Sequence, residues 1–223
     1  MNNYVITEID SAQKKMSAYI SLLSYRYMNL CVKAELGALM PVNVYLGGES
    51  YNIEDVANVY SPDEFQFSVY PKNENNQQEI IQGIYEAHPE FKMESKTSAG
   101  GSYILYTMPE VDESRHDFLQ NAIKGLYEEC CARIEAIRVE FKEHMLEDLT
   151  KVGTSKEETD EALQALDDLH ERSQKMADHQ LEQKQAEIDE ALARYELSKT
   201  IKQNKESDFD YSKGMRLYQP ESE

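Results

Sequence analysis

Acidic residues and histidines are the side chains of this sequence that could most readily perform chemistry. Carboxylates recur four positions apart, as at Glu143 and Glu147, and such a pair can hold a metal ion from one face of a helix. The five histidines show no H-E-x-x-H or similar ligand spacing; they are His88, His116, His144, His170 and His179. We interpret both sets as solvated helix faces, and we expect neither a metal nor a cofactor.

The cysteines and the glycine pairs give weaker chemical signals. Cys130 falls on an apolar helical stripe beside Cys131, so we expect it to be packed rather than reactive. Cys31 stands alone, and this arrangement is no disulfide framework, which fits a reducing cytoplasm. Gly47–Gly48 and Gly100–Gly101 lack the context of a phosphate loop and are expected to be turns. No Ser/His/Asp set stands out, so we do not predict an enzyme.

Composition restricts the possible partners. The chain of 223 residues carries 42 acidic and 23 basic side chains, for a net charge of −19, and such a protein repels bare phosphate. No apolar run approaches the length of about 18 residues that a membrane span needs. The first residues lack the basic and apolar regions of a signal peptide. We expect a soluble, cytoplasmic monomer that does not bind membranes.

Two very long helices are the elements that must position any functional residue. Apolar residues recur every three or four positions on both sides of a break at Val152–Ser155, which indicates two helices that each bury one face. These residues are Ile123, Leu126, Cys130, Ile134, Ile137, Phe141, Met145 and Leu149, then Leu163, Leu166, Leu169, Met176, Leu181, Ile188 and Leu192. Gly153 suits a helix end, and Ser155 with Glu158 has capping-box spacing, so the helices should run antiparallel.

A third helix near the N-terminus would close the groove between these two. From Thr7 or Asp10 to Glu35 the apolar residues again share one face, and Gly37 and Pro41 end the pattern. We therefore predict a long antiparallel three-helix bundle made of residues 7–36 and 112–195. Residues 196–223 are polar and are expected to form a flexible tail.

The stretch 40–109 changes character and predicts a small inserted α/β domain. Strand-like alternation appears near Val42–Leu46, Glu64–Tyr70 and Tyr103–Met108, and Asn76–Ala87 has helical spacing. The overall class is α+β, with a β/α/β sandwich-like unit set between the first two long helices. Two short segments connect the inserted domain to the bundle, and we call them the crossings. They should act as a hinge, formed by Leu36, Gly37, Pro41, Met108, Pro109 and Val111.

Several strings inside this plan resemble the ribosome recycling factor family. They are Val42-x-Val44-Tyr45-x-Gly47, Ile53-x-Asp55-Val56-Ala57-x-Val59, Pro62 with Val69-Tyr70-Pro71, Glu79-Ile80-Ile81-x-x-Ile84-x-x-Ala87, Ser98-x-Gly100-x-x-Ile104 before Pro109, and Glu113-x-Arg115-His116-x-x-Leu119. The resemblance implies an L-shaped, two-domain protein of tRNA size. It implies binding to the ribosome, mainly its large subunit, and action with elongation factor G on the post-termination complex. It also implies a mechanical role without an active site.

The resemblance points to basic residues of the second long helix as contacts with ribosomal RNA. The nucleic-acid candidates are Arg115, Arg133, Arg138 and Lys142. The family has an Arg pair spaced by three on this helix, and here Glu135 stands in the first position and Arg138 in the second. Intrahelical ion pairs with Glu135 and Glu143 are an alternative role for these cations. A diverged paralogue that binds a basic protein instead of RNA is therefore the alternative function.

Overall fold

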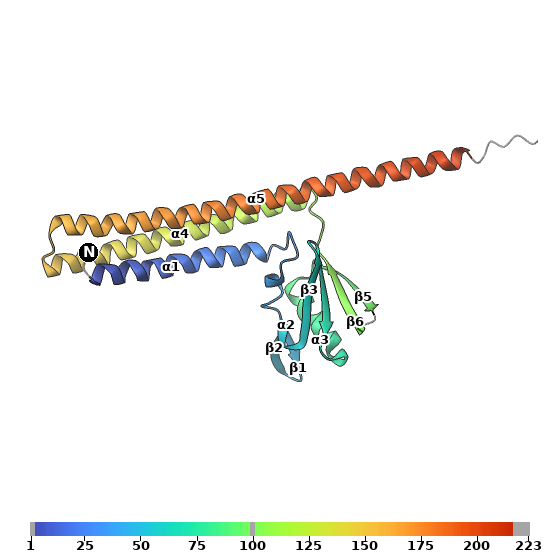
Figure 1. Cartoon of the computed structure of the whole chain (residues 1–223), viewed down its shortest axis with the longest axis horizontal. Coiled ribbons are helices and arrows are strands. Elements are labelled where there is room, and N and C mark those ends of the chain that lie inside the picture. Colours follow the sequence, from blue (N-terminus) through green and yellow to red (C-terminus); the bar gives the residue numbers. More distant parts are fainter. Residues whose placement is uncertain (1–2, 99–100, 216–223) are drawn as a thin grey trace, which may run out of the picture.

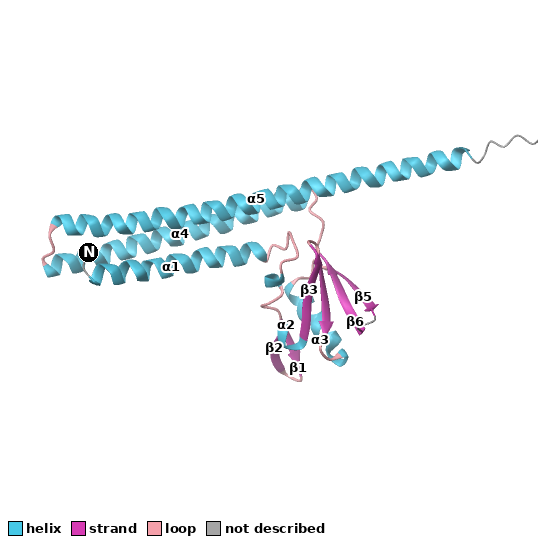
Figure 2. Cartoon of the chain, viewed as in Figure 1, coloured by secondary structure: helices cyan, strands magenta, loops and turns pink. Residues whose placement is uncertain are grey.

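The computed structural model describes residues 3–98 and 101–215, and these form an L (Figure 1). Three long helices lie side by side in the long arm, and the strands all belong to a separate head (Figure 2). The three helices are α1 (Asn3–Met28), α4 (Glu113–Val152) and α5 (Lys156–Met215). Because the head is inserted between α1 and α4, the predicted α+β class with an L-shaped architecture is confirmed.

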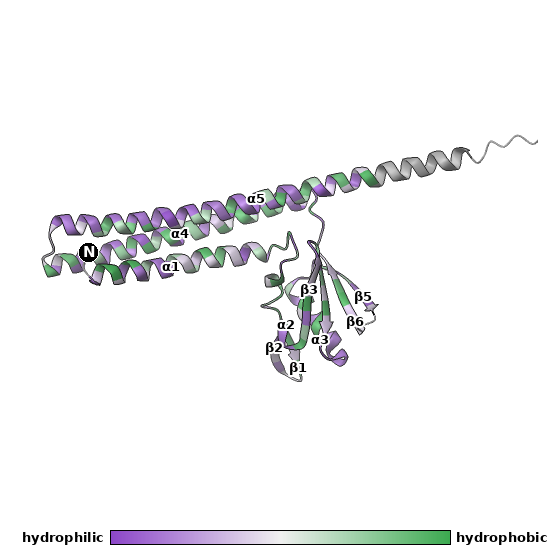
Figure 3. Cartoon of the chain, viewed as in Figure 1, coloured by the Kyte–Doolittle hydropathy of each residue, from purple (hydrophilic) through white to green (hydrophobic). Residues whose placement is uncertain are grey.

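Buried stripes hold the three helices together. In α1 the stripe runs through Met16, Ile20 and Leu23, and in α4 it includes Ile123 and Ile134, all at most 4% exposed. Burying such a side chain contributes about 1.5–3 kcal/mol, so a continuous seam stabilises helices far longer than the globular average. Colouring by hydropathy shows apolar and polar residues interleaved along each helix (Figure 3).

Small residues explain why the apolar pattern of α5 is irregular. Ala162, Ser173 and Ala177 are buried in the seam, where they let the neighbouring helices approach. Met176, which the spacing predicts to lie on the buried stripe, is wrongly placed by that pattern because it is 56% exposed. Hydropathy alone therefore misses the seam where alanine and serine form it.

The sharp break between α4 and α5 follows from its residues. Gly153 adopts a left-handed φ of 72°, and the N–H of Thr154 donates to the carbonyl oxygen of Leu149 at 3.1 Å. Ser155 accepts from the N–H of Glu158 at 3.3 Å and donates to its carboxylate at 3.2 Å. Hydrogen-bonding groups at the end of α4 and at the start of α5 thus find partners within the break itself. α5 then runs back alongside α4.

The head contains two antiparallel sheets and two short α-helices. The first sheet pairs β1 (Asn43–Leu46) with β2 (Glu49–Asn52), and the second has the order β3-β4-β6-β5. Its strands are β3 (Ala57–Asp63), β4 (Gln66–Pro71), β5 (Lys92–Ser98) and β6 (Gly101–Thr107), and the helices are α2 (Ile53–Val56) and α3 (Gln77–Ala87). Single 3₁₀ turns lie at η1 (Leu36–Ala38) and η2 (Glu74–Asn76).

α3 packs closely on β1 because a glycine faces the strand. A Cβ at Gly83 would lie 2.5 Å from the carbonyl oxygen of Asn43, so any larger residue would push the helix away. Ile80 and Ile84 of α3, both fully buried, pack with Phe67 and Ile104 in the head's own hydrophobic core.

The bundle and the head have separate hydrophobic cores, and the chain changes core at two short crossings. At the first, Val32 belongs to the bundle core, whereas Cys31 and Ala34 belong to the head core. At the second, Met108 packs in the head and Val111 in the bundle. Each body therefore has its own core, and the backbone passes between the two bodies only at these two crossings.

Several expected boundaries are wrong, and one of them is the start of α1, which is Asn3 and not Thr7 or Asp10. α1 ends at Met28, not near Leu36, because Cys31 takes a φ of 50° and the chain turns toward the head. The first crossing consequently lies before Leu36, Gly37 and Pro41. The expected tail does not begin at residue 196, because α5 continues helically to Met215; residues 216–223 lie outside the described part.

Candidate nucleic-acid interface

The four basic candidates all lie on α4, and the structure gives them different environments. Arg115 follows the N-cap Asp112, whose carboxylate accepts its backbone N–H at 2.8 Å. Its guanidinium turns inward and donates to the carbonyl oxygen of Leu30 at 3.3 Å. Burial lowers the pKa of this guanidinium, and nearby Glu90 opposes that shift. Arg115 thus joins the start of α4 to the segment after α1.

Arg138 is occupied by two carboxylates. It makes a two-pronged contact with Glu135, at 2.8 Å and 2.6 Å, and donates to Asp167 of α5 at 3.0 Å. The hydrogen bonds of Glu135 and Asp167 raise the pKa of Arg138, and the same contact lowers the pKa of Glu135. His170 also approaches Glu135, at 3.1 Å. The geometry matches the intrahelical alternative and adds a cross-helix pair between α4 and α5.

Arg133 and Lys142 are the candidates that remain available. Within the described residues neither forms an ion pair. Arg133 is exposed and borders a shallow groove between α1 and α4, which Tyr19 and Leu22 also line. From Arg133 to Lys142 the helix makes about two and a half turns at about 3.6 residues per turn, so the two side chains leave α4 on opposite sides. The four candidates do not form one basic patch.

The junction between head and bundle contains a contact that sequence spacing gave no reason to expect. Arg194 of α5 donates to Glu64 of the head at 2.6 Å, and its guanidinium lies 5.2 Å from the centre of the Phe65 ring. Lys33 approaches Glu190 at 3.7 Å on the same side. A cleft of about 270 Å³ separates the two bodies here, and Val32, Met108, Pro109 and Val111 are among its lining residues.

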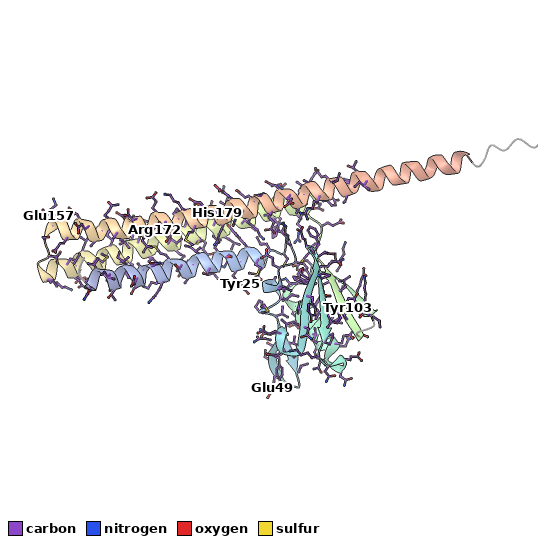
Figure 4. The ribbon with its side chains drawn as sticks, in the orientation of Figure 1. Tyr25, Glu49, Tyr103, Glu157, Arg172 and His179 are labelled. Atoms are coloured by element: carbon purple, nitrogen blue, oxygen red, sulfur yellow. The ribbon has the colours of Figure 1, made fainter. Side chains whose placement is uncertain are left out.

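Three tyrosine rings that the sequence did not single out meet on the sheet of the head, where Tyr60 is exposed and Tyr70 and Tyr103 are half-buried. Tyr70 stacks on Tyr103 with ring centres 4.9 Å apart and meets the edge of Tyr60 at 5.7 Å. Figure 4 places Tyr103 on the head, away from the bundle. Strand alternation predicts β4 and β6, but it does not tell which tyrosines meet across β3, β4 and β6.

The thiols of Cys31 and Cys130 are both buried. Burial raises the pKa of the Cys31 thiol to about 12 and that of Cys130 to about 11. Cys130 packs in the bundle core, as expected, whereas Cys31 packs in the head core.

In the described chain, no helix combines the length and apolar character needed to cross a membrane.

Comparison with known proteins identifies the fold. The solution structure of a ribosome recycling factor aligns with a TM-score of 0.66 and 21% identity, covering 84% of this chain and 98% of that chain. The T. thermophilus ribosome recycling factor, in a structure with the E. coli elongation factor G bound to the E. coli post-termination complex, aligns with a TM-score of 0.57 and 20% identity, covering 82% and 98%. No curated protein sequence gives a significant match.

The family is shown by sequence rather than by fold. The sequence profile of the family described as ribosome recycling factor matches residues 27–188. This span begins at the end of α1, contains the whole head and α4, and ends within α5. It therefore includes both crossings between the two cores. The chain belongs to the ribosome recycling factor family.

Proposed function

We propose that this protein acts in translation by binding the post-termination ribosome and helping to take it apart with elongation factor G. The observation that carries the proposal is the family match over residues 27–188, which spans both bodies and both crossings. One structural neighbour is the T. thermophilus factor bound, together with elongation factor G, to such a complex. We place the activity in the cytoplasm, where these partners work.

The proposed role is mechanical and uses no covalent chemistry. The bundle is a stiff lever, because three helices share one core along its length. The head has its own core, so a push on the head moves it as a unit about the two crossings. We propose Met108, Pro109 and Val111, together with the segment that leads to Leu36, Gly37 and Pro41, as the hinge.

We further propose that Arg133 and Lys142 make the ribosome contacts of α4. Their charges are not paired within the described residues, whereas Arg138 is held by Glu135 and Asp167. Each phosphate contact releases counterions and contributes about 0.9 to the slope of log affinity against log salt. Binding should therefore be weak at physiological salt, because few cations are free and the chain carries a net charge of −19.

Sedimentation with purified ribosomes tests this proposal. At low salt the protein should pellet with ribosomes, and Arg133→Gln should reduce the salt slope by about one unit. Arg172→Gln, an exposed arginine of α5, is the matched control and should leave the slope unchanged. Splitting of post-termination ribosomes with elongation factor G and GTP gives the activity. Failure to bind ribosomes at any ionic strength would refute the proposal.

A second candidate function is an interaction module that binds a basic protein. The occupied guanidinium of Arg138 and the acidic charge of the chain favour it, because both weaken attraction to RNA. Affinity capture with and without nuclease separates the two functions. A basic protein retained after nuclease treatment, together with no rescue of a recycling-deficient strain, would select this second function.

A further inference from the structure

Three side chains with metal-binding chemistry meet where the chain passes from the bundle to the head. Cys31 lies just beyond α1, and His88 and Glu90 lie just beyond α3. One ligand atom from each lies within 4.8 Å of the other two. Cys31 and His88 are buried and Glu90 is exposed, so the cluster has a closed side and a side open to solvent.

Two of the three distances between the ligand atoms fit a single tetrahedral ion, and the third, from the sulfur of Cys31 to the carboxylate of Glu90, is within 4.8 Å. Zinc binds sulfur at about 2.3 Å and imidazole nitrogen at about 2.0 Å, so tetrahedral angles place these two ligand atoms about 3.5 Å apart. The sulfur of Cys31 and Nδ1 of His88 are 3.6 Å apart. Nitrogen and carboxylate oxygen on one such ion are about 3.4 Å apart. Nδ1 of His88 and Oε1 of Glu90 are 3.5 Å apart.

The contacts of His88 orient its Nδ1 toward Cys31 and Glu90. Nε2 lies 3.1 Å from the carbonyl oxygen of Ala38, which can only accept, so Nε2 carries the proton. In the neutral ring Nδ1 then presents a lone pair to Cys31 and Glu90. Phe91 stacks on the imidazole with ring centres 4.6 Å apart and fixes its plane. A carbonyl that orients a ligating histidine is the usual second shell of a metal site.

The same geometry leaves an electrostatic conflict when nothing lies between the ligands. Unprotonated Nδ1 and the carboxylate of Glu90 are both acceptors, yet they face each other at 3.5 Å. The sulfur of Cys31 also lies 3.4 Å from the carbonyl oxygen of Asn29, so its single thiol proton can satisfy only one of three acceptors. A cation bound between the sulfur of Cys31, Nδ1 of His88 and the carboxylate of Glu90 would remove this conflict. A proton on Nδ1, donated to the Glu90 carboxylate, is the alternative to the cation.

We propose that Cys31, His88 and Glu90 bind one zinc ion, with water as the fourth ligand. On binding, the Cys31 thiol releases its proton to solvent and its sulfur forms the bond to zinc. The thiolate and the Glu90 carboxylate together balance the 2+ charge. Arg115 and Lys184 are the opposing cations that act on the Cys31 thiol, and the interaction of Arg115 with Asp112 offsets part of its charge.

The ion would fasten the first crossing to the head. Cys31 belongs to the segment that leaves the bundle, whereas His88 and Glu90 belong to the loop between α3 and β5. A shared ion joins these segments and stabilises the native state by mass action. The proposal concerns the junction itself and does not depend on ribosome binding.

Cobalt(II) titration of the full chain, freed of metal with a chelator, tests the site. A bound cobalt ion should give visible bands of tetrahedral coordination and a near-ultraviolet thiolate-to-cobalt band at one equivalent, and zinc should displace it. Cys31→Ser should abolish the thiolate band. Glu90→Gln should weaken binding by more than about tenfold, the least that loss of an outer-shell partner typically costs.

Two control variants make the result specific. Cys131→Ser removes a half-buried thiol of the bundle, and Glu94→Gln removes an exposed carboxylate of β5. Both should bind cobalt as the unmodified chain does. If Cys31→Ser does not fold, as judged by circular dichroism, the exposed Glu90→Gln decides. Absence of the thiolate band, or its persistence in Cys31→Ser, would overturn the proposal. Either result would favour a proton on Nδ1 of His88 in place of the metal ion.

Discussion

Arg194 and Glu64 are separated by most of the sequence, yet Nη1 of Arg194 lies 2.6 Å from Oε2 of Glu64. Arg194 belongs to α5, and Glu64 belongs to the turn between β3 and β4. The same guanidinium is steadied by Glu190 at 2.7 Å and lies over the Phe65 ring. This pair links the bundle and the head outside their covalent crossings.

We predict that Arg194→Ala widens the range of angles between head and bundle without unfolding either. The contact is exposed, so its loss should change orientation more than stability. Single-molecule energy transfer between dyes at Glu49 and Glu157, which Figure 4 places in the head and at the far end of the bundle, measures the angle. Arg172→Ala on the same helix is the control. Identical distributions for Arg194→Ala and the unmodified chain would contradict the prediction.

Ile134→Ala should destabilise the bundle by about 2–5 kcal/mol, since it leaves a cavity where the three helices meet. Ile134 is fully buried, whereas Val139 on the same helix is 42% exposed. Val139→Ala should therefore change stability by only about 0.5 kcal/mol. Urea unfolding of the two variants, followed by circular dichroism, compares them. Equal losses would mean that the seam does not carry the stability of the bundle.

The sequence could predict the helices well because their burial is periodic. The same reasoning missed β2 and β5, whose residues are exposed throughout and so show no alternation of apolar and polar side chains. It extended α1 too far because Leu30 and Ala34 continue the helical spacing from Tyr27 after the backbone has turned. Periodicity reports which residues are buried, and burial continues across such a turn.

The site was less predictable than the fold because its contacts are long-range. Local spacing correctly indicated the ion pair of Arg138 with Glu135, which lies within one helical turn of it. It could not indicate Asp167, because that residue reaches Arg138 only through the antiparallel return of α5. The meeting of Cys31 with His88 depends in the same way on the path of the chain into the head.

Stability should depend on pH through His116. Its Nε2 lies 2.7 Å from Asp189 of α5, and this hydrogen bond raises the pKa of His116 above its ordinary value of about 6.5. A raised pKa means that the folded state holds the proton more tightly. The stabilisation is therefore complete below the unfolded pKa and is lost as pH rises through the folded pKa.

Urea midpoints measured from about pH 5.5 to pH 9 test this coupling. The advantage of the unmodified chain over His116→Gln should shrink as pH rises. Gln120→Ala is the control, because Gln120 donates to the same Asp189 oxygen at 3.0 Å but carries no titrating proton. A constant difference between the unmodified chain and His116→Gln at every pH would show that the ion pair contributes nothing measurable.

Two glycines of the α4 segment should respond to alanine with opposite signs. A Cβ at Gly125 or at Gly153 meets nothing within 4 Å, so packing does not distinguish them. Gly125 lies inside α4, where alanine should stabilise by about 0.5–1 kcal/mol through the lower entropy of the unfolded chain. Gly153 has a φ of 72°, where alanine should cost about 1–2 kcal/mol of strain.

Thermal unfolding of the two single variants and of the double variant separates these backbone effects. Gly125→Ala should raise the midpoint and Gly153→Ala should lower it. Because the two positions share no contact, the double variant should unfold at the sum of the two shifts. If Gly153→Ala were as stable as the unmodified chain, the left-handed turn would not be what returns α5 alongside α4. The reversal would then have to depend on Ser155 and its contact with Glu158.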